Sequence, residues 1–232
     1  MRTVFKGILL AALLLCLSSH ASAQTPNGLA PLEPEYDFGC IGIDYQVYHN
    51  FKLVNYGSDT VRISRVYSNC DCSFVAFADT VVPPQDTASF KLTFNTKDFY
   101  GRTPKTVIVI SDDKTTPEYR VSYLSTIGQW MHRVRPTPAS LFYLPVHKTK
   151  TLSIDNLGRT KIHLRDIEPL DDMVTIEPQD EEAEAGESLK IEVKPQEDLP
   201  AGTFQSCFRL TFDVEGAKEP LLMTIPVKIV RY

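Results

Sequence analysis

Two cysteines separated by a single residue, Cys70 and Cys72, are the sharpest chemical feature of this sequence. If the segment is an extended strand, both sulfur atoms project from the same face. A disulfide between them would then close a very small and strained ring, so this geometry disfavours their mutual pairing. The two thiols could instead bind a soft ion such as Cu(I) or zinc, or carry out thiol redox chemistry. Two thiolates are an incomplete metal site, however, and no His-x-His or second Cys-x-Cys motif completes it.

Cys40 is the expected partner for one of these cysteines. A turn after Asn55 would fold the strand that ends at Cys70 back along the preceding one, which brings Cys40, Cys70 and Cys72 to one end of the first domain. An oxidising compartment favours a disulfide, so we expect Cys40 to pair with either Cys70 or Cys72. Such a bond closes a loop of about 30 residues and contributes roughly 3 kcal/mol in the chain-entropy model. A three-thiolate soft-metal site at Cys40, Cys70 and Cys72 is the alternative if the protein matures in its reduced form.

Cys207 stands in a different setting, on a strand whose side chains alternate between two faces. Phe208, Leu210 and Phe212 occupy one face, which leaves Cys207 on the other. We therefore predict that Cys207 is a free thiol on the outer face of the second domain. A bulky maleimide should then label it rapidly without denaturant.

The remaining residues with catalytic potential form no constellation. Four histidines follow the N-terminal leader, each alone in its local sequence: His49, His132, His147 and His163. The sequence has no Gly-x-Ser-x-Gly elbow, no paired metal histidines and no phosphate-binding glycine loop. We therefore expect neither an enzyme nor a bound cofactor.

Acidic and aromatic residues gather in two further places. The segment from Asp171 to Glu187 contains eight acidic residues and no basic one. A solvated loop is the favoured interpretation, and a calcium site is the alternative, since the EF-hand spacing is missing. Phe99 and Tyr100 stand at a predicted loop tip, where they either contact a partner or fold back over the end of the domain.

An internal repeat organises the elements that must position these residues. The sequence FKLVNYGSDTVRISRV at residues 51–66 returns as LSIDNLGRTKIHLRDI at residues 152–167, with the Asn-x-Gly turns 101 residues apart. Alternating apolar residues around such turns predict short antiparallel strands, and about seven of them per repeat predict an immunoglobulin-like β-sandwich. We expect an all-β protein of two tandem seven-stranded sandwiches, at residues 34–130 and 134–232. Gly39 marks a close backbone approach or a kink.

The N-terminal residues indicate export, and the overall charge excludes some classes of partner. Arg2 and Lys6 precede an apolar run at residues 7–17, and small residues end at Ala23, so residues 1–23 are predicted to be a signal peptide. The Pro-rich residues 24–33 are expected to be a linker. Removing Arg2 and Lys6 changes the net charge from −5 to −7. This acidic balance argues against nucleic acid and against anionic membrane surfaces, and no integral membrane segment is expected after processing.

Five stretches of the first repeat resemble a bacterial extracytoplasmic family of unknown function. They read PEYDFGCI, FKLVNYGSDTVRISRV, NCDCSF, VVPPQDTASFKLTFN and YGRTPKTVIVIS, and the resemblance covers about residues 34–129. That family has the order Phe-Asp-Phe-Gly, Asn-x-Gly, Cys-Gly-Cys and Pro-Gly, and is related to Hydin-type and major-sperm-protein-like immunoglobulin-like domains. This sequence differs by Asp71 and Gln85 in place of glycines and by the additional Cys40. The resemblance implies a seven-stranded sandwich outside the cytoplasm and carries no established activity.

These observations favour an exported, non-enzymatic scaffold or adaptor that binds a protein or envelope component. The expected location is the periplasm or the exterior of a Gram-negative bacterium. Sandwich loops and sheet edges suit such recognition. The alternatives are a periplasmic assembly chaperone that acts by strand addition and a thiol-based soft-metal or redox carrier at Cys70 and Cys72.

Overall fold

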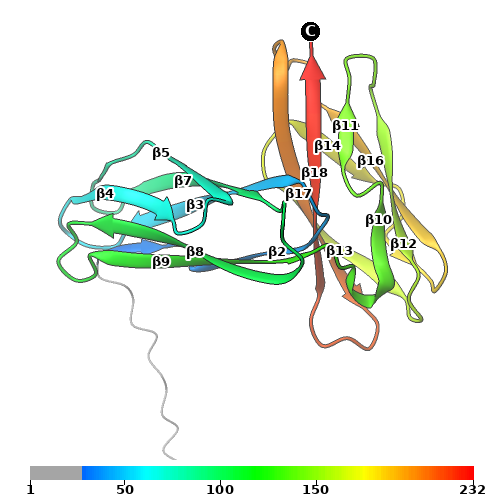
Figure 1. The fold of residues 1–232 in the computed structure, drawn as a ribbon, viewed down its shortest axis with the longest axis horizontal. Coiled ribbons are helices and arrows are strands. Elements are labelled where there is room, and N and C mark those ends of the chain that lie inside the picture. Colours follow the sequence, from blue (N-terminus) through cyan, green and yellow to red (C-terminus); the bar gives the residue numbers. More distant parts are fainter. Residues whose placement is uncertain (1–27) are drawn as a thin grey trace, which may run out of the picture.

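Figure 1 shows the computed structural model, which describes residues 28–232 as an all-β protein of two immunoglobulin-like sandwiches. The predicted signal peptide at residues 1–23 lies outside the described residues. Within residues 28–232, the one helical segment is a short 3-10 turn, η1 (Met131–Arg133), which joins the two sandwiches. No helix in this described part is long and apolar enough to span a membrane.

The first sandwich consists of nine strands in two layers. One layer has the strand order β1-β3-β7-β5 and the other contains β2-β9-β8-β4-β6. The strands are β1 (Leu29–Pro31), β2 (Glu35–Ile41), β3 (Gln46–Asn55), β4 (Val61–Ser68), β5 (Ser73–Phe77), β6 (Val81–Val82), β7 (Thr87–Asn95), β8 (Gly101–Ser111) and β9 (Glu118–Ile127). Although β3 and β4 are consecutive in the sequence, they belong to opposite layers, as is usual in immunoglobulin-like sandwiches.

The second sandwich repeats this arrangement. Its strands are β10 (Val134–Thr137), β11 (Leu141–Tyr143), β12 (Lys150–Asn156), β13 (Ile162–Pro169), β14 (Val174–Pro178), β15 (Glu182–Ala183), β16 (Ser188–Pro195), β17 (Gly202–Val214) and β18 (Leu221–Arg231). Each of β13 to β17 begins 101 residues after its counterpart among β4 to β8, for example at Ile162 and Val61. The repeated sequence therefore folds twice into the same order of strands.

The N-terminal boundary of the first sandwich differs from the predicted one. Residues 24–33 were expected to form a linker, but Leu29–Pro31 forms β1 and pairs antiparallel with the end of β3. Leu29 is completely buried and belongs to the first hydrophobic core. Burial of this apolar side chain explains why the segment is held against the sheet.

The repeated Asn-x-Gly turn has a structural role in both sandwiches. Asn55 is fully buried, and its side-chain amide donates hydrogen bonds to the carbonyls of Asp59 and Val82. The side-chain oxygen Oδ1 of Asn55 accepts a hydrogen bond from the backbone N–H of Gly57 at 3.0 Å. Asn156 is equally buried and makes the corresponding contacts in the second sandwich. One buried amide thus fastens each turn to the short strand, β6 or β15, that crosses beside it.

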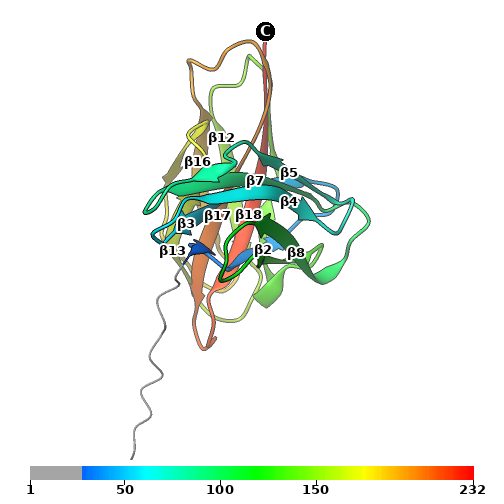
Figure 2. The same cartoon turned by 90° about the vertical axis from the view of Figure 1, so that its left-hand side faces the viewer.

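The two sandwiches share one sheet. β18 of the second pairs in parallel with β2 of the first through Met223 and Cys40, which joins ten strands into one continuous sheet. Figures 1 and 2 show that the strands of one sandwich run across those of the other. Gly39 has a φ of +70°, and a Cβ on it would lie 2.2 Å from the backbone carbonyl carbon of Leu222. The predicted close approach at Gly39 is thus one of the contacts between the two domains, and it needs glycine.

Candidate functional site

The Cys70–Cys72 segment is a turn and not a strand, and this changes its chemistry. The structure has a disulfide between Cys70 and Cys72, whose Cα atoms lie 5.1 Å apart. The backbone N–H of Ser73 donates to the carbonyl of Cys70 at 3.1 Å, which closes the turn just before β5 begins. Mutual pairing of Cys70 and Cys72 is disfavoured only when the backbone between them is extended. In a turn the two Cα atoms come within the ordinary range for a disulfide.

Cys40 is not bonded to Cys70 or Cys72, so the expected pairing is wrong in this structure. Cys40 is a free, buried thiol on β2, whereas Cys70 follows β4. Strands β9 and β8 lie between β2 and β4 in the sheet, which separates them by roughly 14 Å at the usual spacing of strands. The prediction placed β3 and β4 in one hairpin, but they lie in opposite layers. The three thiols therefore do not converge, and a three-thiolate metal site does not form from them.

Cys207 is also a free thiol, but it is completely buried. It lies on the outward side of β17, as the alternation predicted, yet the first sandwich covers that side and Cys207 belongs to the first hydrophobic core. Its Sγ lies 3.5 Å from the carbonyl oxygen of Tyr48. Burial raises the pKa of the Cys207 thiol well above its ordinary value. The predicted exposed position of Cys207 is thus wrong, because the docked domain shields the sulfur.

The junction between the sandwiches contains a cluster of polar side chains around Arg209. The guanidinium donates from Nη1 to the carbonyl of Asp37 at 2.8 Å and pairs with Glu168 at 2.5 Å. It also lies over the ring of Tyr36, 4.4 Å from the ring centroid. One second-domain residue therefore holds the backbone and an aromatic ring of the first domain.

His49 lies on the other side of the Tyr36 ring. The two rings stack with their centroids 3.6 Å apart, and Nε2 of His49 lies 2.9 Å from Glu33. Burial lowers the pKa of His49 and outweighs the opposing effect of Glu33. Burial also raises the pKa of the Glu168 carboxyl, and Arg209 opposes that rise. These groups contact one another at the junction, so they help to hold the two domains together.

A groove of about 550 Å³ opens at the junction and is lined by both domains. The start of β3 and the end of β7 line it from the first domain. β11 and β18 line it from the second domain. The lining residues are Asp44, Tyr45, Gln46, Asn95, Ser140, Leu141, Phe142, Gln205, Pro226, Val227 and Lys228. Phe142 is 45% exposed, and the ammonium of Lys228 lies 5.9 Å from its ring centroid. An exposed aromatic ring beside a cation is a surface of the kind that can contact a polypeptide.

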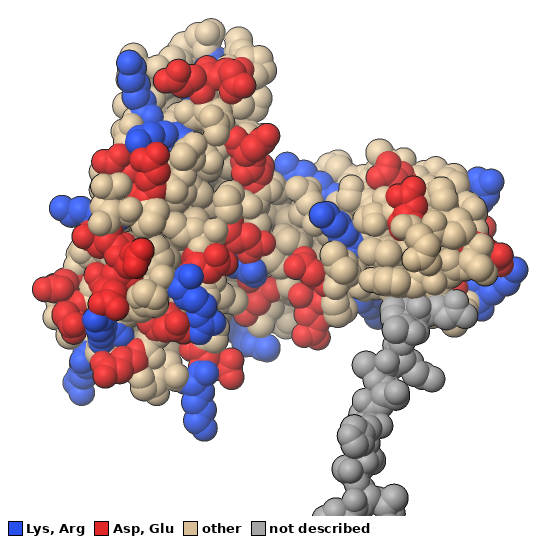
Figure 3. Space-filling model, turned by 180° about the vertical axis from the view of Figure 1, so that it is seen from behind, with Lys and Arg blue, Asp and Glu red and all other residues tan. Residues whose placement is uncertain are grey.

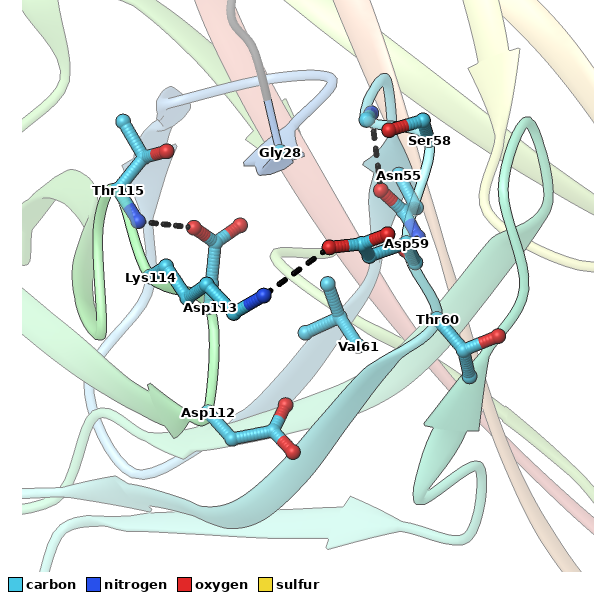
Figure 4. A pocket seen from close by; sticks show the side chains of 11 residues that line it. Gly28, Asn55, Ser58, Asp59, Thr60, Val61, Asp112, Asp113, Lys114 and Thr115 are labelled. Carbon is cyan, nitrogen blue, oxygen red and sulfur yellow. Dashed lines mark hydrogen bonds and ion pairs between the residues drawn. The ribbon is translucent and has the colours of Figure 1, made fainter.

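A smaller pocket of about 230 Å³ lies at the far end of the first sandwich (Figure 4). Asp113 accepts backbone N–H groups of Leu29 at 2.6 Å and Thr115 at 2.7 Å, so its carboxylate ties β1 to the β8–β9 loop. Burial raises the pKa of Asp113, but these backbone donors outweigh it and the net pKa is lowered. Asp59 and Lys114 form an exposed ion pair across the pocket at 3.2 Å. The carboxylates of Asp113 and Asp59 thus contact other residues of the loops at this end of the sandwich.

The acidic segment from Asp171 to Glu187 is spread over β14, β15 and their turns. Lys161 pairs with Glu182 and Glu184, and Lys194 pairs with Glu177. Other members of the segment accept backbone N–H groups, as Asp180 does from Lys190. In residues 28–232 no three potential ligands come together to hold a metal ion.

The two aromatic residues of the loop tip behave differently from each other. Phe99 packs against Phe94 at the end of the sandwich, with ring centroids 5.9 Å apart. Tyr100 is 68% exposed. His163 is partly exposed, and its Nδ1 lies 3.5 Å from a carboxylate oxygen of Glu182.

Sequence reasoning missed two features that the structure makes prominent. Arg209 links the two domains at the junction. The only hint of this in the sequence is a cation between the apolar residues Phe208 and Leu210 of a strand. Phe74 is 69% exposed on β5, at the margin of the first sandwich in Figure 1. Its signal is the uncharged run Ser73–Phe77 directly after the cysteines.

Comparison with solved structures gives weak likenesses of overall architecture. A protein of unknown function from Porphyromonas gingivalis W83 is 12% identical over 88% of this chain and 100% of that one, with a TM-score of 0.36. The CupB2 chaperone of Pseudomonas aeruginosa is 7% identical over 84% of this chain and 98% of that one, with a TM-score of 0.33. The PapD-like domain 7 of human CEP192 is 10% identical over 53% of this chain and 97% of that domain, with a TM-score of 0.37.

Comparison with characterised sequences adds no relative, since no curated protein matches this chain. A family profile does match part of it, residues 30–123, which is the first sandwich from β1 into β9. That family is described as a protein of unknown function (DUF1573). The first sandwich is therefore similar to a domain family whose function is not known.

Proposed function

We propose that this protein is an exported, non-enzymatic scaffold or adaptor that binds a protein or envelope component through its two sandwiches. The observation that carries this proposal is the junction groove, whose walls come from both domains. A groove of this kind has a defined shape only if the two domains keep one orientation. The shared β18–β2 sheet, the Gly39 contact and the Arg209 cluster supply that constraint.

The chemistry of the groove supports a polypeptide partner. Phe142 offers exposed aromatic surface, Lys228 offers a cation, and Tyr45 and Asn95 offer polar groups at the opposite wall. Aromatic anchors with a polar rim are typical of protein interfaces. Export is part of the proposal and is supported by the basic, apolar and small-residue pattern at the N-terminus.

Site-specific photo-cross-linking in intact cells tests this proposal. A benzoylphenylalanine at Phe142 should give one discrete adduct in the cell envelope, and Lys228→Glu should reduce its yield at least fivefold. The matched control carries the probe at Tyr232, which is also aromatic and is 92% exposed. No adduct at position 142, or equal adducts at positions 142 and 232, would contradict a binding role for the groove.

A further inference from the structure

β5 is an open sheet edge. In the layer β1-β3-β7-β5 it pairs only with β7, from Ser73 opposite Phe94 to Phe77 opposite Phe90. The backbone N–H of Asn95 donates to the carbonyl of Cys72 at 2.9 Å, which sets the phase of this ladder. Because antiparallel pairs alternate, Phe74 and Ala76 exchange hydrogen bonds with β7, and the N–H and C=O groups of Val75 and Phe77 point away from the sheet.

The side chains of β5 leave this edge accessible. Phe74 and Ala76 are exposed on the outer face, whereas Val75 and Phe77 pack partly against the core. The strand reads Ser-Phe-Val-Ala-Phe, with no charge and no proline. Natural proteins normally protect such an exposed edge strand against pairing with another chain, for example with a charged residue or a proline, and β5 has neither.

Every other edge strand in residues 28–232 is protected. β6 and β15 have two residues each, β11 has three, and β1 and β10 are short and contain proline. β14 is the counterpart of β5, five residues long and 101 residues later. It reads Val-Thr-Ile-Glu-Pro, and its Glu177 pairs with Lys194 at 2.6 Å. The first sandwich therefore lacks the charge and the proline that blunt the same edge in the second.

The charges at the two ends of β5 indicate what can pair there. Asp71 and Asp79 are exposed and stand four residues on either side of Val75. A second copy paired antiparallel about Val75 would place Asp71 of each chain opposite Asp79 of the other, and like charges at such positions are destabilising. A strand with basic residues at both ends meets these carboxylates favourably instead.

We propose that β5 is a strand-addition site for an extended segment of a protein partner, with apolar side chains beside Phe74 and a basic residue at each end. The outward N–H and C=O groups of Val75 and Phe77 would hydrogen-bond to its backbone, and Asp71 and Asp79 would select its ends. This assignment rests on the proposed binding function and places a second contact outside the junction groove.

A synthetic peptide tests the site on the full mature chain. The probe is a fluorescent nine-residue peptide of alternating valine and threonine with a lysine at each end, followed by anisotropy. Glutamate in place of both lysines, or N-methylation of alternate backbone amides, should weaken binding at least tenfold. Equal binding of the N-methylated peptide would overturn strand addition, because that peptide keeps every side chain.

Variants of β5 locate the binding. Val75→Pro removes an outward N–H while leaving the ladder to β7, and should weaken binding at least tenfold. Val75→Ala is the matched control, which loses the side chain but keeps the donor, and should change binding less than threefold. Circular dichroism and thermal unfolding establish that both variants fold. Unchanged binding to a folded Val75→Pro variant would refute the proposal.

Charge variants separate a partner from a second copy. Asp71→Lys with Asp79→Lys should reverse the preference, so that the glutamate-ended peptide binds at least tenfold more tightly than the lysine-ended one. Asp71→Lys alone makes the edge self-complementary and should produce dimers in sedimentation, whereas the unaltered chain stays monomeric. A dimer of the unaltered chain that Val75→Pro abolishes would show that the occupant is a second copy, against this proposal. Cross-linking at Phe142 is independent of β5, so it can persist when this inference fails.

Discussion

Two turns at equivalent positions, Cys70–Cys72 in the first sandwich and Asp171–Met173 in the second, have similar hydrogen bonding and different side chains. The backbone N–H of Cys72 donates to Sγ of Cys70 at 3.2 Å. In the second sandwich the N–H of Met173 donates to a carboxylate oxygen of Asp171 at 2.8 Å. A disulfide reinforces one turn and a side-chain hydrogen bond reinforces the other. The second sandwich thus connects its two layers through the same kind of turn without a disulfide.

The strands that follow these turns also differ, because the one in the second sandwich has residues that protect its open edge and the one in the first does not. The second sandwich protects β14 with Glu177 and Pro178, while β5 of the first has no such residue. Charge follows the same division, since Figure 3 shows acidic and basic side chains crowded on the second sandwich and more uncharged surface on the first. On the face drawn there, the first sandwich therefore exposes more uncharged surface than the second.

The largest expected effect comes from a substitution that disrupts the contact between the two sandwiches. Gly39→Ala should lower the free energy of unfolding by about 4 kcal/mol, from a left-handed φ and a clash with the backbone of Leu222. Urea denaturation measures the loss, and maleimide labelling of Cys207 reports undocking. Gly216→Ala is the control, because Gly216 has a φ of +80° but no atom within 4 Å of an added Cβ. Equal effects of the two variants would mean that the junction does not depend on Gly39.

The buried Asn-x-Gly amides test how far the two halves share one design. Asn55→Ala and Asn156→Ala should each destabilise the protein by about 3 kcal/mol, because each leaves buried backbone groups without partners. Hydrogen exchange should show the loss first in the altered sandwich. Asn50→Ala, at an exposed position on β3, should change stability by less than about 0.5 kcal/mol. A small effect at Asn156 alone would break the equivalence.

Exchanging one turn for the other tests the first comparison directly. Cys70→Ala with Cys72→Ala should cost about 1.5 kcal/mol, the chain-entropy value for a three-residue loop. Cys70→Asp with Cys72→Met copies the second turn and should recover at least half of that loss, because the aspartate can accept the same N–H. Thermal unfolding under non-reducing conditions measures both variants. No recovery would mean that the two turns are not interchangeable.

The smallest expected effect concerns acid sensitivity of the first sandwich. The pKa of Asp113 is lowered in the folded chain, so its contribution to stability is complete above the unfolded value of about 3.9 and is lost as the pH falls through the folded value. Asp113→Asn should cost about 1 kcal/mol at pH 7 and make stability less dependent on pH below about 4. Asp59→Asn, at an exposed carboxylate, is the control. An identical pH profile for both variants would contradict the assignment.

Local periodicity was sufficient to predict the repeat. The alternation of Ala88, Phe90, Leu92 and Phe94 predicts a strand with one buried face, and β7 has that pattern. The same holds for the Asn-x-Gly turns, because a turn is decided by the residues within it. These features depend on residues that are close in the sequence.

Tertiary structure alone decided the environment of the cysteines and of Arg209. Alternation places Cys207 on the outward side of β17, but only the docking of the first sandwich determines that this side is buried. The pairing of Cys40 depended on which layer holds β3 and β4, and an alternating pattern is the same in either layer. Arg209 meets Asp37 across 172 positions of sequence. Contacts of this range follow from the packing of whole sheets, which no local pattern of residues contains.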